Sequence, residues 1–288
     1  MKKSTQLREL MKQDRLIVAP GATTALLARL VENAGFPAVY ATGAGLANMN
    51  FGLPDFNLIN MVENLEIVRR MNDAVKIPII ADIDDGYGAP VNVMRTVKEY
   101  CRAGIAAVQM EDQQNPKRCG HFDGQVVIPL RDMVAKIKAA KDAMDDPDMV
   151  LIARTDAISA TGSFDEALER GAAFAEAGAD VIFIEAPKTI EQVARIPKEM
   201  PVPTLLNIVE QGKTPALPIP EIERLGFRFV IYANAPLKAS VLGTQRLLTY
   251  LKENGTTDGC DGELMITSAE RQELLDKDYY QSLIAKYQ

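Results

Sequence analysis

The sequence has little of what disulfide scaffolds, zinc fingers and membrane proteins need. It holds three cysteines and one histidine in 288 residues. Cys101, Cys119 and Cys260 are widely spaced and form no CxxC pair, so we expect neither a disulfide framework nor a structural zinc site. No apolar run is long enough to span a bilayer, and the opening MKKSTQLRELMKQDRL lacks the apolar core of a signal peptide. We therefore expect a cytoplasmic protein that does not enter membranes.

An excess of positive charge is also missing. Lysine and arginine number 32 against 39 aspartates and glutamates, which gives a net charge of −7. Such a surface repels nucleic acid and anionic lipid, so we expect neither as a partner. With 47% hydrophobic and 25% charged residues, the chain has the composition of a globular protein with a sizeable core. A small anionic substrate would need a local basic pocket.

Eight short β-rich runs alternate with amphipathic helical segments. Several are nearly continuous Val, Ile, Leu and Ala, which is typical of parallel strands covered on both faces. The runs span residues 15–20, 37–43, 76–84, 105–112, 149–156, 179–187, 202–210 and 227–234. A doubly wound sheet has the same local pattern, but the count of eight predicts a (β/α)8 TIM-type barrel. No low-complexity linker divides the chain, so we expect one domain over 1–288, with a barrel core over about 15–235 and C-terminal helices over about 236–288.

Polar residues gather where these strands end. In a barrel the carboxyl ends of the strands converge on one mouth, where active sites are built. For any single residue a solvated loop position is the simpler interpretation, but crowding like charges costs stability, so the whole set favours a site. The set is Tyr40, Thr42, Asp82, Asp84, Glu111, Asp112, Arg154, Asp156, Glu185 and Asn207.

The stretch ADIDDGYG (81–88) predicts a metal site. Asp82 and Asp84 lie on the same side of one strand, and Glu111 ends the next. Hard oxygen ligands in this arrangement suit an octahedral Mg²⁺ that keeps several waters. An acidic turn is the alternative for this motif alone, and Glu111 shifts the balance towards a metal.

The stretch TGAG (42–45) follows a strand and opens a GxGxxN pattern (43–48). A dinucleotide fingerprint needs a third glycine, so the pattern argues against NAD. A backbone nest that holds a substrate carboxylate fits better.

The stretch KRCGH (117–121) joins one cysteine to the one histidine. Pro116, Gly120 and Gly124 mark the segment as a long loop over the barrel mouth. Lys117 and Arg118 favour a thiolate at Cys119, which is typical of a reactive cysteine. An inert cysteine and a structural histidine are the alternatives for each residue taken alone.

Together these stretches resemble the isocitrate lyase/phosphoenolpyruvate mutase superfamily, and within it the short lyases that act on methylisocitrate and 2,3-dimethylmalate. Matching motifs run in family order over most of the chain. They are TGAG (42–45), GLPD (52–55), DIDDGYG (82–88), EDQ (111–113), KRCGH (117–121), ARTDA (153–157), IEAP (184–187) and LLNIVEQGKTP (205–215). The phosphonate-processing branches lack the cysteine of the loop.

The resemblance implies site roles position by position. Asp82, Asp84 and Glu111 match the Mg²⁺ set, with Mn²⁺ as an alternative metal and Asp55 in support through water. The substrate-binding set comprises Thr42, Gly43, Ala44 and Arg154 for the 2-oxo-acid side, Asn207, Thr214, Gly120 and His121 for the other carboxylate, and Glu185 without a subsite. Cys119 matches the proton donor and Tyr40 a candidate base, and the catalytic set also includes Glu111, Lys117, Arg118 and His121.

The activity implied is a Mg²⁺-dependent lyase that splits a 2-hydroxy dicarboxylate into pyruvate and a second carboxylate. The metal lowers the alcohol's pKa, and a cysteine tuned near neutral pH protonates the carbon left behind. The resemblance also implies a homotetramer that exchanges a C-terminal helix. The rival of another class is an inactive barrel that serves as a scaffold, and the intact Cys119, Asp82, Glu111 and Arg154 argue against it.

Two departures from the family bear on the substrate. Position 109 is Gln where the tricarboxylate enzymes have His, and Asp85 adds a negative charge near the metal set. Both disfavour a third carboxylate, although Lys213 or Arg271 can supply a cation for one. The first choice is therefore 2,3-dimethylmalate, giving pyruvate and propionate. The alternatives are 2-methylisocitrate and the hydrolysis of oxaloacetate.

Overall fold

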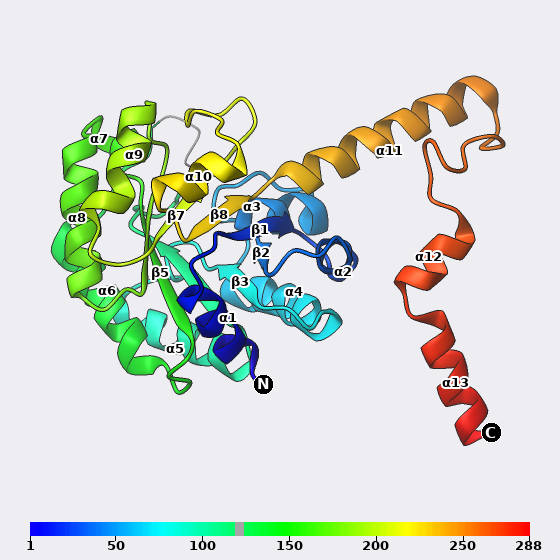
Figure 1. Cartoon of the computed structure of the whole chain (residues 1–288), viewed down its shortest axis with the longest axis horizontal. Helices are drawn as coiled ribbons and strands as arrows, with labels where there is room; N and C mark the ends of the chain where they lie inside the picture. Colours follow the sequence, from blue (N-terminus) through cyan, green and yellow to red (C-terminus); the bar gives the residue numbers. More distant parts are fainter. Residues whose placement is uncertain (119–123) are drawn as a thin grey trace. The chain divides into compact units, whose positions relative to one another are not determined.

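A computed structural model describes residues 1–118 and 124–288 of the chain. Eight parallel strands close into a barrel in which each strand pairs with the next in chain order and β8 pairs with β1 (Figure 1). The strands are β1 Ile17–Ala22, β2 Val39–Ala41, β3 Ile79–Asp82, β4 Ala107–Glu111, β5 Val150–Thr155, β6 Val181–Ile184, β7 Thr204–Asn207 and β8 Phe229–Tyr232. The predicted (β/α)8 barrel is confirmed.

Helices connect successive strands and cover the outside of the barrel (Figure 1). Those of the barrel unit are α1 Lys3–Lys12, α2 Ala25–Asn33, α3 Gly43–Leu46, the π-helix η1 Ala47–Phe51, α4 Met61–Ala74, α5 Pro90–Arg102, α6 Leu130–Ala143, α7 Ala157–Thr161, α8 Phe164–Glu176, α9 Ile190–Glu199 and α10 Ile219–Leu225. The short α3 and α7 directly follow β2 and β5, so they begin at the carboxyl ends of these strands, where the site lies.

Each strand buries both of its faces, which explains the continuous apolar runs. In β5, Val150 and Ile152 point into the barrel interior, whereas Leu151 and Ala153 pack towards the surrounding helices. The amino-terminal end of the barrel is closed by α1, whose fully buried Leu7 joins the interior cluster. The carboxyl-terminal end is left as the mouth.

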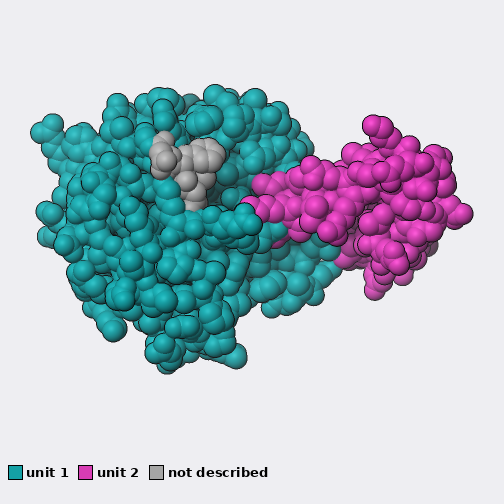
Figure 2. Space-filling model, turned by 90° about the horizontal axis from the view of Figure 1, so that it is seen from above, with its two compact units in different colours: residues 1–235 teal, residues 236–288 magenta. Residues whose placement is uncertain are grey.

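Residues 236–288 form a second compact unit, distinct from residues 1–235 (Figure 2). It contains nearly all of α11 Ala235–Asn254, together with α12 Ser268–Leu274 and α13 Lys277–Tyr287. No residue of α12 or α13 is buried. Exposed apolar side chains are Val241, Leu242, Leu248, Leu251, Ile266, Leu275, Tyr279, Tyr280, Ile284 and Tyr287. The single-domain interpretation of 1–288 stays a prediction.

Across residues 1–118 and 124–288, the structure contains no helix with the length and apolarity required to cross a bilayer.

Candidate active site

A small cavity of about 40 Å³ lies at the mouth of the barrel, and polar side chains from the ends of the strands line it. Its lining residues are Tyr40, Thr42, Ala44, Asp55, Asp82, Lys117, Arg154, Glu185, Asn207, Val209, Ile231, Ala233 and Asn234. The structure therefore brings together most of the described residues predicted for the metal and the substrate. Of the predicted set, Cys119, Gly120 and His121 lie outside the described residues.

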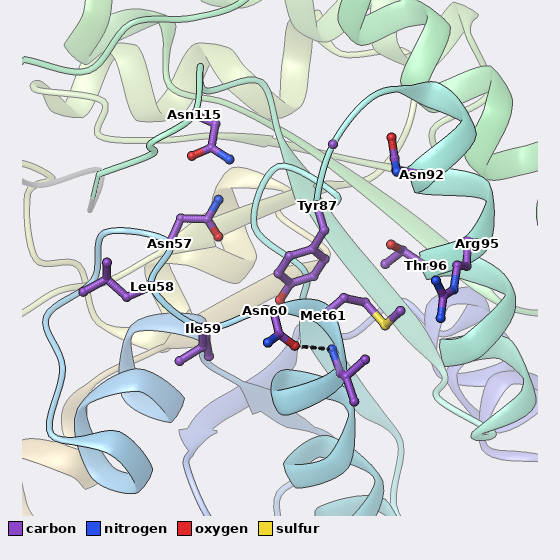
Figure 3. A pocket seen from close by; sticks show the side chains of 12 residues that line it. Asn57, Leu58, Ile59, Asn60, Met61, Tyr87, Asn92, Arg95, Thr96 and Asn115 are labelled. Atoms are coloured by element: carbon purple, nitrogen blue, oxygen red, sulfur yellow. Dashed lines mark hydrogen bonds between the residues drawn. The ribbon is translucent and has the colours of Figure 1, made fainter.

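A larger cavity of about 630 Å³ lies beside the starts of α4 and α5 and shares no described lining residue with the cavity at the mouth (Figure 3). Figure 3 shows the ring of Tyr87 at its centre, with Asn57, Asn60, Asn92 and Asn115 around it. Among the described residues, Arg95 is the one charged residue in its lining, and none of the lining side chains is a carboxylate. Because its described lining offers neither a pair of acid and base groups nor a carboxylate to bind a divalent cation, we assign the site to the mouth.

The acidic cluster at the mouth is built around the ammonium of Lys117. Its Nζ lies 2.6 Å from Asp55 Oδ1 and 2.6 Å from Asp84 Oδ1, and its side chain is 4% exposed. Burial disfavours the charged ammonium, but the carboxylates of Asp84, Asp55 and nearby acids raise the pKa of Lys117 well above its usual value. Lys117 is therefore a buried cation inside the site. Its expected effect on the pKa of Cys119 stays a prediction, because Cys119 lies outside the described residues.

The pKa values of two carboxylates near Lys117 are raised. Burial raises the pKa of Asp84 to about 7, although Lys117 opposes the shift. Burial also raises the pKa of Glu111 well above its usual value, with Arg154 opposing. Both shifts follow from placing several carboxylates in a site that excludes water, which favours their neutral forms.

The described residues fit a divalent cation at this place. Glu111 is buried, neither of its carboxylate oxygens accepts a hydrogen bond from the described residues, and its Oε2 lies 3.3 Å from Nη1 of Arg154. Asp82 Oδ1 accepts from the backbone amide of Asp84, which ties the Asp82 carboxylate to the turn that carries Asp84. No three acidic, histidine or cysteine side chains within residues 1–118 and 124–288 already surround one point as ligands. Hard oxygen donors with unmet acceptor capacity are nevertheless what Mg²⁺ binds.

The turn that carries Asp84 has an unusual backbone. Asp84 and Tyr87 adopt left-handed conformations, with φ of 51° and 60°, and Gly86 lies between them at 83°. Each non-glycine residue held in this region costs about 1–3 kcal/mol and persists only where its surroundings impose it. A side chain at Gly86 would collide with Met110 and Val93, so the turn is packed tightly against β4 and α5.

Asp85 does not add an unbalanced charge to the mouth, contrary to the expectation from the sequence. Its carboxylate lies 3.6 Å from the ammonium of Lys136 on α6 and also accepts from the backbone of Tyr87. The Lys136 ammonium donates to the backbone carbonyl of Asp85 at 2.8 Å. Both side chains are buried, so their charges offset each other within the wall of the barrel.

Arg154 is held by carboxylates on several sides. It makes a two-pronged contact with Asp156, at 2.9 and 2.8 Å, and lies 3.3 Å from Glu111 and 3.9 Å from Glu185. Its guanidinium also lies over the ring of Phe183. Burial opposes the charged form, but the surrounding carboxylates raise the pKa of Arg154 above its usual value. Arg154 therefore stays charged and oriented at the cavity wall.

Behind Arg154 a second ionic layer fixes Asp156. Its backbone amide donates to Asp112, which also accepts from Thr155 and from Arg170 on α8. Burial is the main cause that raises the pKa of Asp112 to about 6, with Asp156 adding to the shift. A chain of contacts thus runs from α8 to the mouth, in which Arg170 contacts Asp112, Asp112 contacts Asp156, and Asp156 contacts Arg154.

Gln109 lies beneath Tyr40 and is not part of the lining of the cavity. It is fully buried, and the hydroxyl of Tyr40 donates to its Oε1. Burial, Asp82 and further carboxylates raise the pKa of Tyr40 well above 10, with Arg154 opposing. A phenol with a raised pKa is a poor base at neutral pH, so the structure favours Tyr40 as a hydrogen-bond donor.

The TGAG stretch forms the turn at the start of α3. Thr42 and Ala44 line the cavity, whereas Gly43 lies behind them with its amide donating to Asp82 at 3.3 Å. A side chain at Gly43 would meet the carboxylate of Asp82 at 3.0 Å, which explains the glycine. One amide of the predicted nest, that of Gly43, is therefore hydrogen-bonded to Asp82.

Of the remaining predicted residues, Asn207 lines the cavity, whereas Thr214 and Arg118 do not. Asn207 lines the cavity and donates to Glu185 at 3.4 Å. Thr214 is buried but is not part of the lining. The backbone of Arg118 is held on both sides by the side chain of Gln113, at 2.7 and 2.9 Å.

Sequence reasoning missed Asn234 and the apolar wall of the cavity. Asn234 follows β8 and lies 3.5 Å from the hydroxyl of Thr42. Val209, Ile231 and Ala233 form the apolar part of the lining. Asn234 ends a predicted strand just as the other site residues do, so the same signal was available for it.

Comparisons with known proteins identify the family of the chain. The family model for phosphoenolpyruvate phosphomutase matches residues 7–251. The 2,3-dimethylmalate lyase of Eubacterium barkeri is 44% identical over 275 residues, covering 96% of this chain and 94% of that one. The 2-methylisocitrate lyase of Bacillus subtilis (strain 168) is 40% identical over 251 residues, covering 87% and 82%.

Solved structures are equally similar in fold. A 2,3-dimethylmalate lyase superposes with a TM-score of 0.93 at 35% identity, covering 100% of this chain and 96% of that one. An oxaloacetate acetylhydrolase bound to 3,3-difluorooxalacetate gives 0.94 at 34%, covering 99% and 97%. A phosphonopyruvate hydrolase in complex with oxalate and Mg²⁺ gives 0.90 at 33%, covering 100% and 99%. The chain therefore belongs to the phosphoenolpyruvate mutase/isocitrate lyase superfamily and is one of its carbon–carbon lyases.

Proposed function

We propose that the protein is a Mg²⁺-dependent lyase that cleaves a substituted malate, with 2,3-dimethylmalate as first choice, into pyruvate and propionate. One observation carries the metal-dependent chemistry. At the buried mouth, two cations, Lys117 and Arg154, face six carboxylates, those of Asp55, Asp82, Asp84, Glu111, Asp156 and Glu185. Such a surplus of buried carboxylates is relieved either by protonation, which their raised pKa values favour, or by a further cation, and a divalent cation fits the oxygen donors present.

Asp82, Asp84 and Glu111 would hold the metal, with Asp55 in support through water. When bound, Mg²⁺ lowers the pKa of the substrate's alcohol and stabilises the carbonyl oxygen that develops as the bond breaks. The complex of a phosphonopyruvate hydrolase with oxalate and Mg²⁺ supports this choice of metal. Mn²⁺ suits the same oxygen donors.

The residues of the chain divide the remaining work. Arg154, fixed by Asp156, binds the carboxylate that becomes part of pyruvate. Tyr40 donates to Gln109 or to a substrate oxygen, since its hydroxyl stays protonated. Thr42, Gly43, Ala44 and Glu185 complete this subsite, and Asn207 and Thr214 serve the second carboxylate, together with Gly120 and His121 of the loop.

Atoms balance with one proton leaving and one arriving. The C2 hydroxyl loses its proton, the C2–C3 bond breaks, and C2 becomes the carbonyl carbon of pyruvate. The electron pair left on C3 takes a proton to give propionate. Cys119 is the proposed proton donor from the family resemblance, and the positive charges of Lys117 and Arg118 belong to the same loop.

A dicarboxylate fits the mouth better than a tricarboxylate. The described lining has two cations, and each already contacts at least two carboxylates. A third substrate carboxylate would be buried without a cation, which costs several kcal/mol, on the order of the penalty for an unpaired buried charge. Val209, Ile231 and Ala233 offer an apolar wall suited to methyl groups. The 44% identity to a 2,3-dimethylmalate lyase over 96% of this chain adds support.

The decisive experiment compares kcat/KM for 2,3-dimethylmalate, 2-methylisocitrate and oxaloacetate on one preparation, with and without EDTA. We expect the highest value for 2,3-dimethylmalate and loss of activity with EDTA that MgCl₂ restores. A clear preference for 2-methylisocitrate would overturn the substrate and leave the lyase mechanism standing. Full activity in EDTA would overturn the role of the metal.

We also propose a cytoplasmic homotetramer in which residues 236–288 are exchanged between subunits. The support is the number of apolar side chains that this unit leaves exposed, including Leu242 and Leu248 at 48% and 58%. Burying such side chains against another copy would stabilise the assembly by about 1.5–3 kcal/mol for each large side chain fully covered.

A further inference from the structure

The turn after β3 is held from outside by a buried cation that is not part of the mouth. Lys136 lies on α6, is 7% exposed, and donates to the backbone carbonyl of Asp85 at 2.8 Å. The carboxylate of Asp85 lies farther from it, at 3.6 Å. The shorter contact of Lys136 is therefore with the backbone of the turn and the longer one with the side chain.

This turn sets the direction of Asp84. Asp84 has a left-handed φ of 51°, its backbone carbonyl accepts from Glu111, and its carboxylate contacts Lys117. The next peptide group carries the carbonyl that Lys136 binds. Beyond it, Thr96 on α5 donates to the carbonyl of Gly86 at 3.2 Å. Two helices thus fix consecutive carbonyls directly after the candidate metal ligand.

We infer that Lys136 is a positioning residue for the metal site: its contact with the Asp85 carbonyl holds Asp84 in the left-handed conformation that aims its carboxylate at the cation. The inference rests on the proposed function, because it gives a role to a residue behind the proposed ligands. Lys136, 52 positions along the chain from Asp84, reaches it through its contacts with Asp85, of which the one with the backbone carbonyl is the shorter. Partners behind metal ligands commonly change metal affinity by about 10–100-fold when removed.

The test is equilibrium binding of Mn²⁺ to the full-length protein, followed by the electron paramagnetic resonance signal of free Mn²⁺, so that no turnover is needed. Lys136→Met should raise the Kd by about tenfold or more. Lys136→Arg should restore most of the affinity, because a guanidinium can also donate to the carbonyl. Lys138→Met is the matched control, since Lys138 is exposed on the same helix, and its Kd should equal that of the wild type.

Two further variants separate positioning from charge balance. Asp85→Asn removes the carboxylate but keeps the backbone carbonyl, so its Kd should stay within about threefold of the wild type, well below the effect of a lost positioning contact. The double variant Lys136→Met with Asp85→Asn leaves no unpaired buried charge, so its melting temperature should recover while its Kd stays raised. It also replaces Lys136→Met in the comparison if that single variant does not fold.

The outcomes distinguish this inference from the proposed function. A wild-type Kd in Lys136→Met, or recovery of the wild-type Kd in the double variant, would overturn the positioning role and leave the lyase proposal standing. A wild-type protein that binds no Mn²⁺ would overturn the proposed metal site, and the inference with it.

Discussion

Lys117 places its ammonium 2.6 Å from the carboxylate of Asp84, inside the cluster proposed to bind a divalent cation. The same ammonium lies equally close to Asp55. A cation of the chain and the proposed divalent cation would therefore compete for the same oxygens. This relationship makes Lys117 a competitor for the metal as well as a stabilising charge.

Replacing Lys117 should reveal that competition. Lys117→Met leaves Asp55 and Asp84 buried without their cation, and removal of one partner from a buried ion pair costs about 3–5 kcal/mol. We expect a lower melting temperature in the absence of metal, and a larger rise on addition of MgCl₂ than in the wild type. Differential scanning calorimetry with and without MgCl₂ measures both. Lys138→Met serves as the control, and an unchanged melting temperature for Lys117→Met without metal would contradict the prediction.

Metal binding should depend on pH because a proton and the metal compete for Asp84. Burial raises the pKa of Asp84 to about 7, so its carboxyl group is mostly neutral below that pH and ionised above it. A metal binds the ionised form, and the affinity for Mn²⁺ should therefore fall by up to about tenfold for each pH unit below 7. Isothermal titration in buffers of different ionisation enthalpy would detect the released proton. An affinity that is flat between about pH 6 and 8 would sink the idea.

Cys119 lies outside the described residues, and its role as proton donor stays a prediction from the family resemblance. A hydroxyl is a far weaker acid than a thiol, so Cys119→Ser should lower kcat by about 10²–10⁴-fold, the usual contribution of a positioned general acid. Substrate binding measured by calorimetry should stay near that of the wild type. Cys101→Ser is the control, because Cys101 lies on α5 away from the mouth. Near-normal turnover in Cys119→Ser would rule out the donor role.

The proposed tetramer should depend on the apolar face of α11. Leu248→Glu places a charge on a side chain that is 58% exposed in the single chain and expected to be covered in the assembly. We expect light scattering coupled to size exclusion to give a tetramer for the wild type and smaller species for this variant. Lys252→Ala, four residues further along the helix, should remain tetrameric. A wild-type protein that is monomeric at micromolar concentration would refute the assembly.

The barrel and the location of its site were predictable because both follow from simple periodicities. Parallel strands buried on both faces leave continuous apolar runs, and polar residues at their ends must meet at one mouth. Asp82, Arg154 and Asn207 were found in this way and line the same cavity. Gln109 was also open to this reasoning, since it precedes Glu111 by two residues on β4 and so lies one layer deeper on the same inward face.

Contacts made by loops and by distant helices were not predictable. Lys117 reaches Asp55 and Asp84 from an irregular segment, which has no periodicity that would indicate its direction. Lys136 neutralises Asp85, which lies 51 residues earlier in the chain, and the sequence around either residue does not predict the pair. The sequence therefore suggested an unbalanced charge at position 85 where the fold supplies a partner.

The chain of contacts from Arg170 through Asp112 and Asp156 to Arg154 restricts which substitutions at the mouth this enzyme tolerates. Replacing Arg154 alone to accept a new substrate would strand Asp156, Glu111 and Glu185, so every such change needs compensating changes in at least one of them. Substitutions in the apolar wall formed by Val209, Ile231 and Ala233 leave no buried charge unpaired, so they need no compensating change. New substrate preferences, whether selected in nature or in the laboratory, should therefore arise first by remodelling that wall, while the charged half of the mouth is inherited unchanged.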